Sequence, residues 1–138
     1  FKEISAKNFD IDIEQDANAF DIRKSIEIVY GIRNFVGNAN KYAKKNIYVS
    51  IKSDSETSEI VIEDDGPGFS KDILAKIGEP YIKSLRTKDK QKAGLGLGIF
   101  IGKTLLEKNY AKILFRNSET RGGAEIKIEW INKNLIKI

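Results

Sequence analysis

The sequence predicts a two-layer α/β sandwich, in which about three helices cover one face of a mixed and mainly antiparallel sheet. Five short apolar segments have the residue pattern of strands, whereas two longer segments repeat apolar residues at helical spacing. Consecutive strands are joined by short polar turns, which favours antiparallel pairing for most of the sheet. Helices that separate such strand pairs are expected to form a layer of their own.

The composition is that of a soluble globular domain. Of the 138 residues, 41% are hydrophobic and 32% are charged, and no apolar run approaches the roughly 20 residues of a membrane helix. We expect one domain, residues 1–138, excised from a longer protein, because the chain starts at Phe1 and contains no methionine. The net charge of +4 is mild, and without aromatic interleaving or a known module we expect no nucleic acid partner.

The first half of the chain is predicted to form a strand, a long helix and two further strands. Phe9–Glu14 alternates apolar and acidic residues, as a half-buried strand does. Apolar residues recur at helical spacing from about Ser25 to Lys44. Ile47–Ile51 alternates again, and a polar stretch then turns the chain into a third strand at Ile60–Ile62.

The second half is predicted to contain two helices and a closing hairpin. A short helix starts at a Ser70 cap and runs to Ile77, and the segment Gly78–Ala93, which lacks periodicity, is expected to be a mobile loop. Leu97–Lys108 has the apolar spacing of a second long helix. Two strands, Ala111–Arg116 and Ala124–Ile131, then close the domain through a tight turn.

Three glycine-bearing stretches follow an asparagine-rich helix in a fixed order. The helix contains Arg33–Tyr42, and the stretches are Asp64–Phe69, Gly94–Gly98 and Gly122–Gly123. Glycines let a backbone approach a ligand closely and point successive N–H groups at phosphate oxygens. Together with a carboxylate, amides and a lysine, they predict a site for a nucleotide and its metal ion.

The polar face of the first helix carries the candidate metal ligands. Asn34, Asn38 and Lys41 are spaced i, i+4 and i+7, which places them along one face. This face is either simply solvated or a binding surface. In the second interpretation Asn38, and with it Asn34, offers an amide oxygen to Mg²⁺, which favours few protein oxygens plus phosphates and water. Lys41 would then neutralise phosphate charge, and Tyr42 would pack on a base.

Asp64 is the candidate for base recognition. It follows Ile60 and Ile62 in steps of two, so its carboxylate should point inward with them. An aspartate here can cap the turn at Gly66, a role that suits Asp65 better, or it can accept a hydrogen bond from an adenine amino group. Gly66 and Gly68 would let the backbone pass close beneath that base.

The second glycine stretch is expected to bind phosphate at a helix start. The run consists of Gly94, Leu95, Gly96, Leu97 and Gly98. Unpaired N–H groups and the positive end of the helix dipole would meet the phosphates there. The dinucleotide fingerprint is excluded because isoleucine occupies positions 99 and 101, and the P-loop because Gly98–Thr104 is one residue short.

The sequence offers no evident general base for ATP hydrolysis. The chain contains no histidine and no cysteine, and position 34 is asparagine, which cannot accept a proton at neutral pH. Such a site is better suited to donating the γ-phosphoryl group to a nucleophile that needs little activation, such as a histidine. That histidine must lie outside this chain.

These blocks together resemble the ATP-binding catalytic domain of sensor histidine kinases, in the superfamily of gyrase, Hsp90, histidine kinases and MutL. The helix matches the N box, and the three glycine stretches match the glycine boxes in order, over roughly residues 8–131. The chain is still more similar to the RegB/PrrB family of membrane-anchored, redox-responsive kinases. This closer similarity is carried by Gly78–Tyr81, Gly94–Glu107, Gly122–Ala124 and Trp130.

The resemblance implies roles for individual residues. It implies that Asn38 binds Mg²⁺, that Asp64 holds adenine, and that Lys41 and Tyr42 contact phosphate and base. It also implies that Gly78–Ala93 is a lid over ATP. The lid carries Tyr81 where many histidine kinases have phenylalanine, and Ala124 stands where many have a threonine that assists adenine binding.

The resemblance further implies partners and a location. The partners are the dimerisation and phosphoacceptor domain of the same kinase and a cognate response regulator. The fragment is expected to be a cytoplasmic monomer without membrane contact, from a protein anchored in a bacterial inner membrane. Two alternatives stay open: an anti-sigma-type serine kinase, which usually has glutamate at the position of Asn34, and a degenerate module for protein contacts only.

Overall fold

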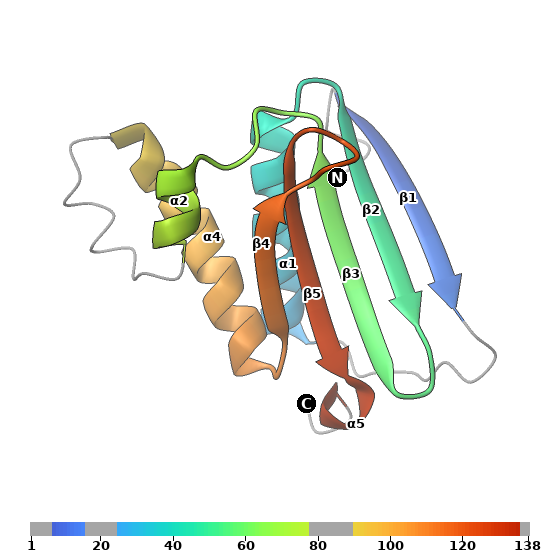
Figure 1. The fold of residues 1–138 in the computed structure, drawn as a ribbon. Helices are drawn as coiled ribbons and strands as arrows, with labels where there is room; N and C mark the ends of the chain where they lie inside the picture. The colour runs from blue at the N-terminus through green and yellow to red at the C-terminus, as the bar shows by residue number, and fades with distance from the viewer. Residues whose placement is uncertain (1–6, 16–24, 78–89, 136–138) are drawn as a thin grey trace.

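The computed structural model describes residues 7–15, 25–77 and 90–135, with the backbone alone for residues 14, 15 and 90–96. One five-stranded sheet has the strand order β1-β2-β3-β5-β4. Figure 1 shows helices α1 and α4 on one face of this sheet, with α2 beside α4. The predicted two-layer α/β sandwich is confirmed.

The sheet is mixed and mainly antiparallel, as predicted. β1 pairs with β2 in parallel, and the other three pairs are antiparallel. The strands are β1 (Asn8–Gln15), β2 (Asn46–Ser53), β3 (Thr57–Asp64), β4 (Lys112–Asn117) and β5 (Ala124–Ile131). Each of the five predicted strands is present. At most of the strand ends, the observed limit differs from the predicted one by a few residues.

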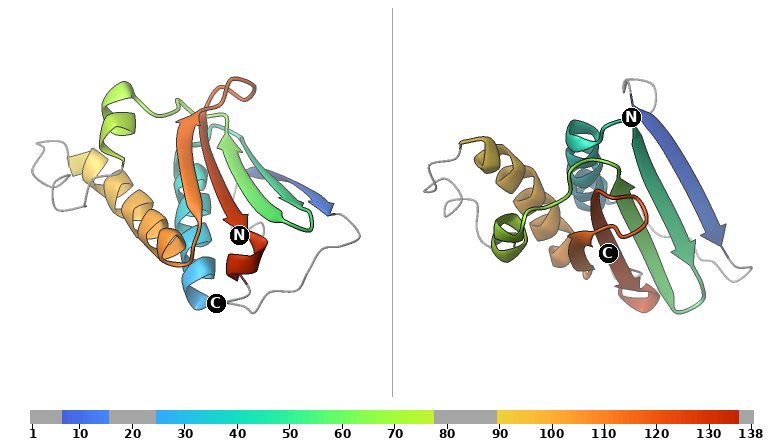
Figure 2. Two further views of the ribbon diagram at one scale, coloured as in Figure 1. Left: turned by 60° about the horizontal axis from the view of Figure 1, so that its bottom comes forward. Right: turned by 45° about the horizontal axis from the view of Figure 1, so that its top comes forward.

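Helices α1 and α4 pack closely against each other at a glycine. α1 (Ile26–Tyr42) begins after the N-cap Ser25, whose hydroxyl accepts a hydrogen bond from the N–H of Ile28. A Cβ atom at Gly31 would lie 2.6 Å from Cγ of Leu106 on α4 (Lys90–Lys108). The two helices lie side by side in both views of Figure 2, and this glycine allows that approach.

The core lies between the helices and the sheet. Its largest fully buried side chains come from both layers: Phe35, Ile47, Ile62, Ile99, Leu106 and Ile128. Phe115 on β4 meets Phe35 edge to face at 5.7 Å between ring centroids, and it meets Phe69 at 6.4 Å. The aromatic contacts therefore anchor the loop after β3 to the core.

The first strand is less buried than its alternating pattern suggests. Ile11 is 51% exposed and Ile13 is 62% exposed, although both lie on the same face as the apolar residues of β2. β1 is an edge strand, and Figure 1 shows that α1 and α4 cover the other end of the sheet. The alternating pattern correctly predicted a strand, but the predicted burial of its apolar face is wrong at Ile11 and Ile13, because no described helix reaches this edge of the sheet.

The second long helix begins earlier than predicted. α4 starts at Lys90 and not at Leu97, so the run Gly94–Gly98 lies inside the helix and not at its free start. Residues 90–93 are Lys, Gln, Lys and Ala, which are good helix formers and offset the cost of the glycines. The expected loop from Gly78 to Ala93 is thus helical at its end, and residues 78–89 lie outside the described part.

Two short helices complete the described chain. α2 (Lys71–Lys76) follows the N-cap Ser70, as predicted. α5 (Asn132–Leu135) was not predicted, because four residues give too little periodicity to recognise. No helix in the described ranges is long and apolar enough to span a bilayer.

Candidate functional site

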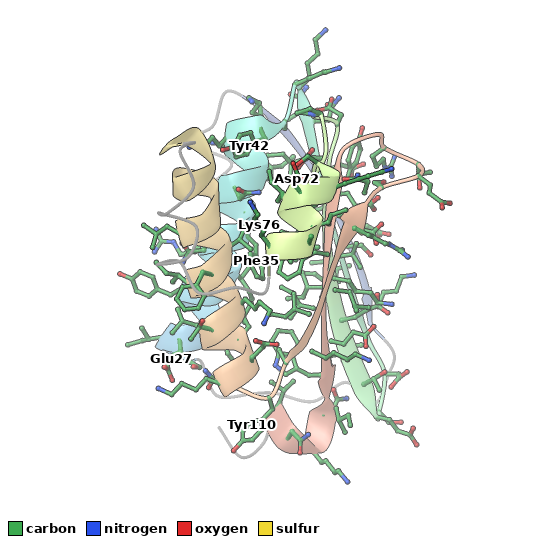
Figure 3. All side chains as sticks on the ribbon, turned by 60° about the vertical axis from the view of Figure 1, so that its left-hand side comes forward. Glu27, Phe35, Tyr42, Asp72, Lys76 and Tyr110 are labelled. Carbon is green, nitrogen blue, oxygen red and sulfur yellow. The ribbon has the colours of Figure 1, made fainter. Side chains whose placement is uncertain are left out.

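A pocket of about 290 Å³ lies between α1, the loop after β3, the start of α2 and the start of β5. In Figure 3, Tyr42 on α1 and Asp72 on α2 lie toward the same end of the molecule, and Glu27 and Tyr110 lie toward the other. The lining residues are Asn38, Tyr42, Asp64, Pro67, Gly68, Phe69, Ser70, Asp72, Ile73 and Ala124.

Asp64 is held in the wall of this pocket by two backbone donors. It is 2% exposed, and its Oδ1 accepts the N–H of Gly66 at 2.9 Å and that of Ala124 at 3.2 Å. The parity argument that turned Asp64 inward is therefore confirmed. Burial raises the pKa of the Asp64 carboxyl above its usual value, and the two N–H groups oppose this only in part.

Asp65 has a different role from the one considered for it. Asp64, and not Asp65, accepts the N–H of Gly66. The carboxylate of Asp65 instead accepts the backbone N–H groups of Lys44, Lys45 and Asn46 at 2.8 to 3.1 Å. It therefore ties the chain after α1 to the loop after β3, which fixes two walls of the pocket relative to each other.

The same contacts set the pKa of Asp65. Burial by itself raises it, but the hydrogen bonds from residues 44–46 outweigh that effect and hold the pKa of Asp65 below its usual range. Two neighbouring carboxyls thus have pKa shifts of opposite direction.

The glycines near the pocket are needed for contacts within the protein. A Cβ atom at Gly66 would collide with the carbonyl oxygen of Tyr42, and one at Gly123 would collide with Asp64. Gly68 has a φ of +78°, which favours glycine, and a Cβ atom there would lie 2.7 Å from Oδ1 of Asn117. The prediction that Gly66 and Gly68 let the backbone pass beneath a base stays a prediction.

Asn117 is a structural contact of the site that sequence reasoning missed. Its Oδ1 accepts the N–H of Phe69 at 2.6 Å, and its Nδ2 donates to the carbonyl of Phe69 at 2.9 Å. The one available signal was parity, because Asn117 shares a face of β4 with the core residue Phe115.

Of the three residues predicted to form the binding face of α1, one lines the pocket. Asn38 lines the pocket, whereas Asn34 and Lys41 are not among its lining residues. Nδ2 of Asn34 donates to the carbonyl of Tyr30 at 2.8 Å. Nζ of Lys41 lies 5.4 Å from the ring centroid of Tyr42, and the lysine is otherwise exposed.

The structure thus brings five of the predicted site residues together around one cavity. These are Asn38, Tyr42, Asp64, Gly68 and Ala124. Gly66, Leu97 and Gly98 do not line it, and Gly94, Leu95 and Gly96 are described only as helical backbone. Tyr81 lies outside the described residues.

Comparison with known proteins identifies the family of this chain. Residues 23–134 match the family model described as histidine kinase-, DNA gyrase B-, and HSP90-like ATPase. The chain is 30% identical over 127 residues to the sensor histidine kinase RegB of Cereibacter sphaeroides, covering 81% of this chain and 28% of RegB. It is 27% identical to the sensor protein QseC of Escherichia coli K12, covering 91% of this chain and 27% of QseC. The chain therefore spans less than a third of either relative.

Solved structures show the same fold. The catalytic domain of the histidine kinase ThkA has a TM-score of 0.66 at 23% identity, over 90% of this chain and 79% of that one. The mycobacterial sensor histidine kinase MprB has a TM-score of 0.64 at 19% identity, over 89% of this chain and 81% of that one. From the family match and the shared fold, we conclude that this chain belongs to the histidine kinase-, DNA gyrase B- and HSP90-like ATPase family.

Proposed function

We propose that this chain is the Mg-ATP-binding catalytic domain of a sensor histidine kinase. It holds ATP so that the γ-phosphoryl group passes to a histidine on a separate dimerisation domain and from there to a response regulator. The observation that carries the proposal is the buried carboxylate of Asp64, oriented by Gly66 and Ala124 in the wall of a 290 Å³ pocket. Family membership supports ATP as the ligand.

Asp64 would recognise the base. Both of its hydrogen bonds end on Oδ1, and Oδ2 takes none from the described residues. That oxygen is left to accept a hydrogen bond from the adenine amino group. Tyr42 and Ala124 line the same pocket, so Tyr42 would pack on the base and Ala124 would leave room beside it without adding a hydroxyl contact.

The residues of α1 would hold the metal and the phosphates. Asn38 lines the pocket, and because Nδ2 of Asn34 is bonded to Tyr30, the Oδ1 atom of Asn34 is the one left for a ligand. Amide oxygens suit Mg²⁺, which would neutralise charge on the phosphates. Lys41 is exposed near the same end of the helix and would contribute a further positive charge.

Catalysis would rest on positioning and charge neutralisation, as is general for phosphoryl transfer. The lining carboxylates are Asp64 and Asp72, and neither lies on α1, where position 34 is asparagine. Asp64 is engaged by two N–H groups and belongs to base recognition in this proposal. A site of this kind binds ATP but turns it over slowly until the acceptor histidine arrives.

The full protein supplies the rest of the reaction. The chain spans 28% of the length of RegB and 27% of QseC, both of which are named as sensor proteins. The dimerisation and phosphoacceptor domain would lie in the remainder of the kinase, and this domain would lie on the cytoplasmic side of a bacterial inner membrane. On its own the domain would be monomeric.

Calorimetry of the 138-residue chain with a non-hydrolysable ATP analogue tests the proposal. We expect binding that weakens when Mg²⁺ is omitted. Asn38→Ala should remove the Mg²⁺-dependent part of the affinity, whereas Asn40→Ala, two positions along on the other side of the helix, should retain it. No heat of binding in the unaltered chain would favour a protein-interaction module. Rapid ATP hydrolysis, abolished by Asn38→Ala, would contradict the argument from the missing base.

A transfer assay separates the two kinase alternatives. The chain is incubated with ATP and a histidine kinase dimerisation domain from the same protein, and the phosphoprotein is exposed to acid. Phosphohistidine is lost in acid, whereas the phosphoserine made by an anti-sigma-type kinase is retained. Acid-stable label on a partner protein would therefore replace the proposed function by the second one.

A further inference from the structure

The side chain of Asn117 holds the loop after β3 through both backbone polar groups of one residue, Phe69. Its side-chain oxygen accepts the N–H of Phe69 at 2.6 Å, and its side-chain nitrogen donates to the carbonyl of Phe69 at 2.9 Å. A side-chain amide has one acceptor and one donor in this geometry, so it satisfies both groups as a neighbouring strand would. Phe69 is therefore fixed in position and in orientation.

The same amide also packs against Gly68, the residue before Phe69. A Cβ atom at Gly68 would lie 2.7 Å from Oδ1 of Asn117 and 3.5 Å from the backbone of Gly123. The glycine thus provides the space that the amide occupies. Gly68 and Phe69 both line the pocket, so the contact with Asn117 sets the place of one pocket wall.

Asn117 is also connected to the part of the pocket that contains Asp64 and Ala124. It ends β4 and pairs with Ala124 at the start of β5, and the N–H of Ala124 donates to Oδ1 of Asp64. One turn of the hairpin therefore carries both the amide that holds Phe69 and the donor that orients Asp64. The position of the loop wall relative to the Asp64 carboxylate therefore depends on this connection as well as on the hydrogen bond from the N–H of Gly66 to Asp64.

From this geometry we infer that Asn117 is a positioning residue for base recognition: it fixes the Pro67–Phe69 wall relative to Asp64 and so sets the selectivity of the pocket for adenine. The inference rests on the proposed ATP-binding function. Asn117 does not line the pocket and so acts on the ligand through Phe69 and Gly68.

The test compares binding of Mg-ADP and Mg-IDP to the 138-residue chain. IDP carries hypoxanthine, which lacks the amino donor that Asp64 would recognise. Asn117→Asp keeps the size of the side chain but replaces the donor to the Phe69 carbonyl by a charged acceptor. We expect a loss of ADP affinity of about ten-fold with a much smaller loss for IDP, so that the ADP-to-IDP ratio collapses.

Asn132→Asp is the matched control. Asn132 is also an amide that bonds both ways, with Nδ2 donating to the carbonyl of Asp54 at 2.7 Å and Oδ1 accepting from Ser58 at 2.6 Å. It does not line the pocket, so its replacement should lower stability without changing the ADP-to-IDP ratio of the folded protein. Asn117→Ser, which removes the two-way contact without adding charge, is measured in parallel.

The outcomes separate the two claims. Folded Asn117 variants with an unchanged ADP-to-IDP ratio, or with equal losses for both nucleotides, would overturn the positioning role. Unfolding of both Asn117 variants, seen by circular dichroism, would show a purely structural role and overturn it too. Failure of the unaltered chain to bind ADP would instead contradict the proposed function.

Discussion

The backbone N–H of Ala124 donates to Oδ1 of Asp64 across 3.2 Å, between residues that are 60 positions apart in the chain. Asp64 ends β3 and Ala124 begins β5, and these strands are neighbours in the sheet. A carboxylate that would be costly to bury alone is stabilised by donors from the chain itself. Strand pairing therefore builds this wall of the pocket.

Gly123→Ala should disturb this wall directly. The new Cβ atom would collide with both the backbone and Oδ1 of Asp64, so the hairpin has to shift. We expect the free energy of unfolding to fall by about 1–3 kcal/mol and ADP affinity to fall with it. Urea denaturation and calorimetry measure the two effects.

Gly37→Ala is the control for that substitution. A Cβ atom at Gly37 meets nothing within 4 Å, and the residue lies inside α1. Alanine is the better helix former, so stability should rise by about 0.5–1 kcal/mol. Equal effects of the two substitutions would show that the predicted collision at Gly123 is relieved without cost.

The close approach of α1 and α4 predicts a non-additive pair. Gly31→Ala should lower stability by about 1–3 kcal/mol, because its Cβ atom would lie 2.6 Å from Cγ of Leu106. Leu106→Ala should cost about 2–5 kcal/mol through the cavity it leaves in the core. In the double variant the new methyl group enters that cavity, so the combined loss should be clearly smaller than the sum. Urea denaturation of all four proteins checks this, and strict additivity would contradict the packing described.

Stability should depend on pH with opposite signs at Asp64 and Asp65. The pKa of Asp64 is raised by burial, so the stability contributed by its protonated form is present below the unfolded-state value and is lost as pH rises through the raised pKa. The advantage of the unaltered chain over Asp64→Asn should therefore shrink as pH rises from about 4 towards neutrality.

Asp65→Asn is the matched comparison at the next position. The pKa of Asp65 is lowered, because the hydrogen bonds from residues 44–46 outweigh its burial. Its contribution is present above the unfolded-state value and is lost as pH falls through the lowered pKa. The advantage of the unaltered chain over Asp65→Asn should thus grow with rising pH in urea denaturation. If the stability difference from the unaltered chain changed with pH in the same direction for both variants, the opposite pKa shifts of Asp64 and Asp65 would be contradicted.

Much of the fold could be predicted from local features of the sequence, such as capping residues and apolar periodicity. Ser70 caps the helix that it was expected to cap, and the two-residue period placed Asp64 on the inner face of β3. The order of the boxes also predicted the family. These features depend on neighbours within a few residues, which is why periodicity and capping residues report them.

Other features depend on which elements meet. The exposure of Ile11 and Ile13 follows from the position of β1 at the edge of the sheet. Helix α4 begins at Lys90 and continues through the glycine run that was expected to mark its start. Neither the strand order nor the balance between helix formers and glycines is visible in a local pattern.

The sequence by itself predicted the class of ligand and five of the residues that line the pocket, because glycines, asparagines and an inward-facing aspartate in one order suit only a few chemistries. Only the tertiary structure decided how these residues are held. The hydrogen bonds pair the N–H of Ala124 with Asp64, those of residues 44–46 with Asp65, and that of Phe69 with Asn117. Hydrogen bonds between distant segments form when strands and loops are brought into register, and no spacing along the chain encodes those partners.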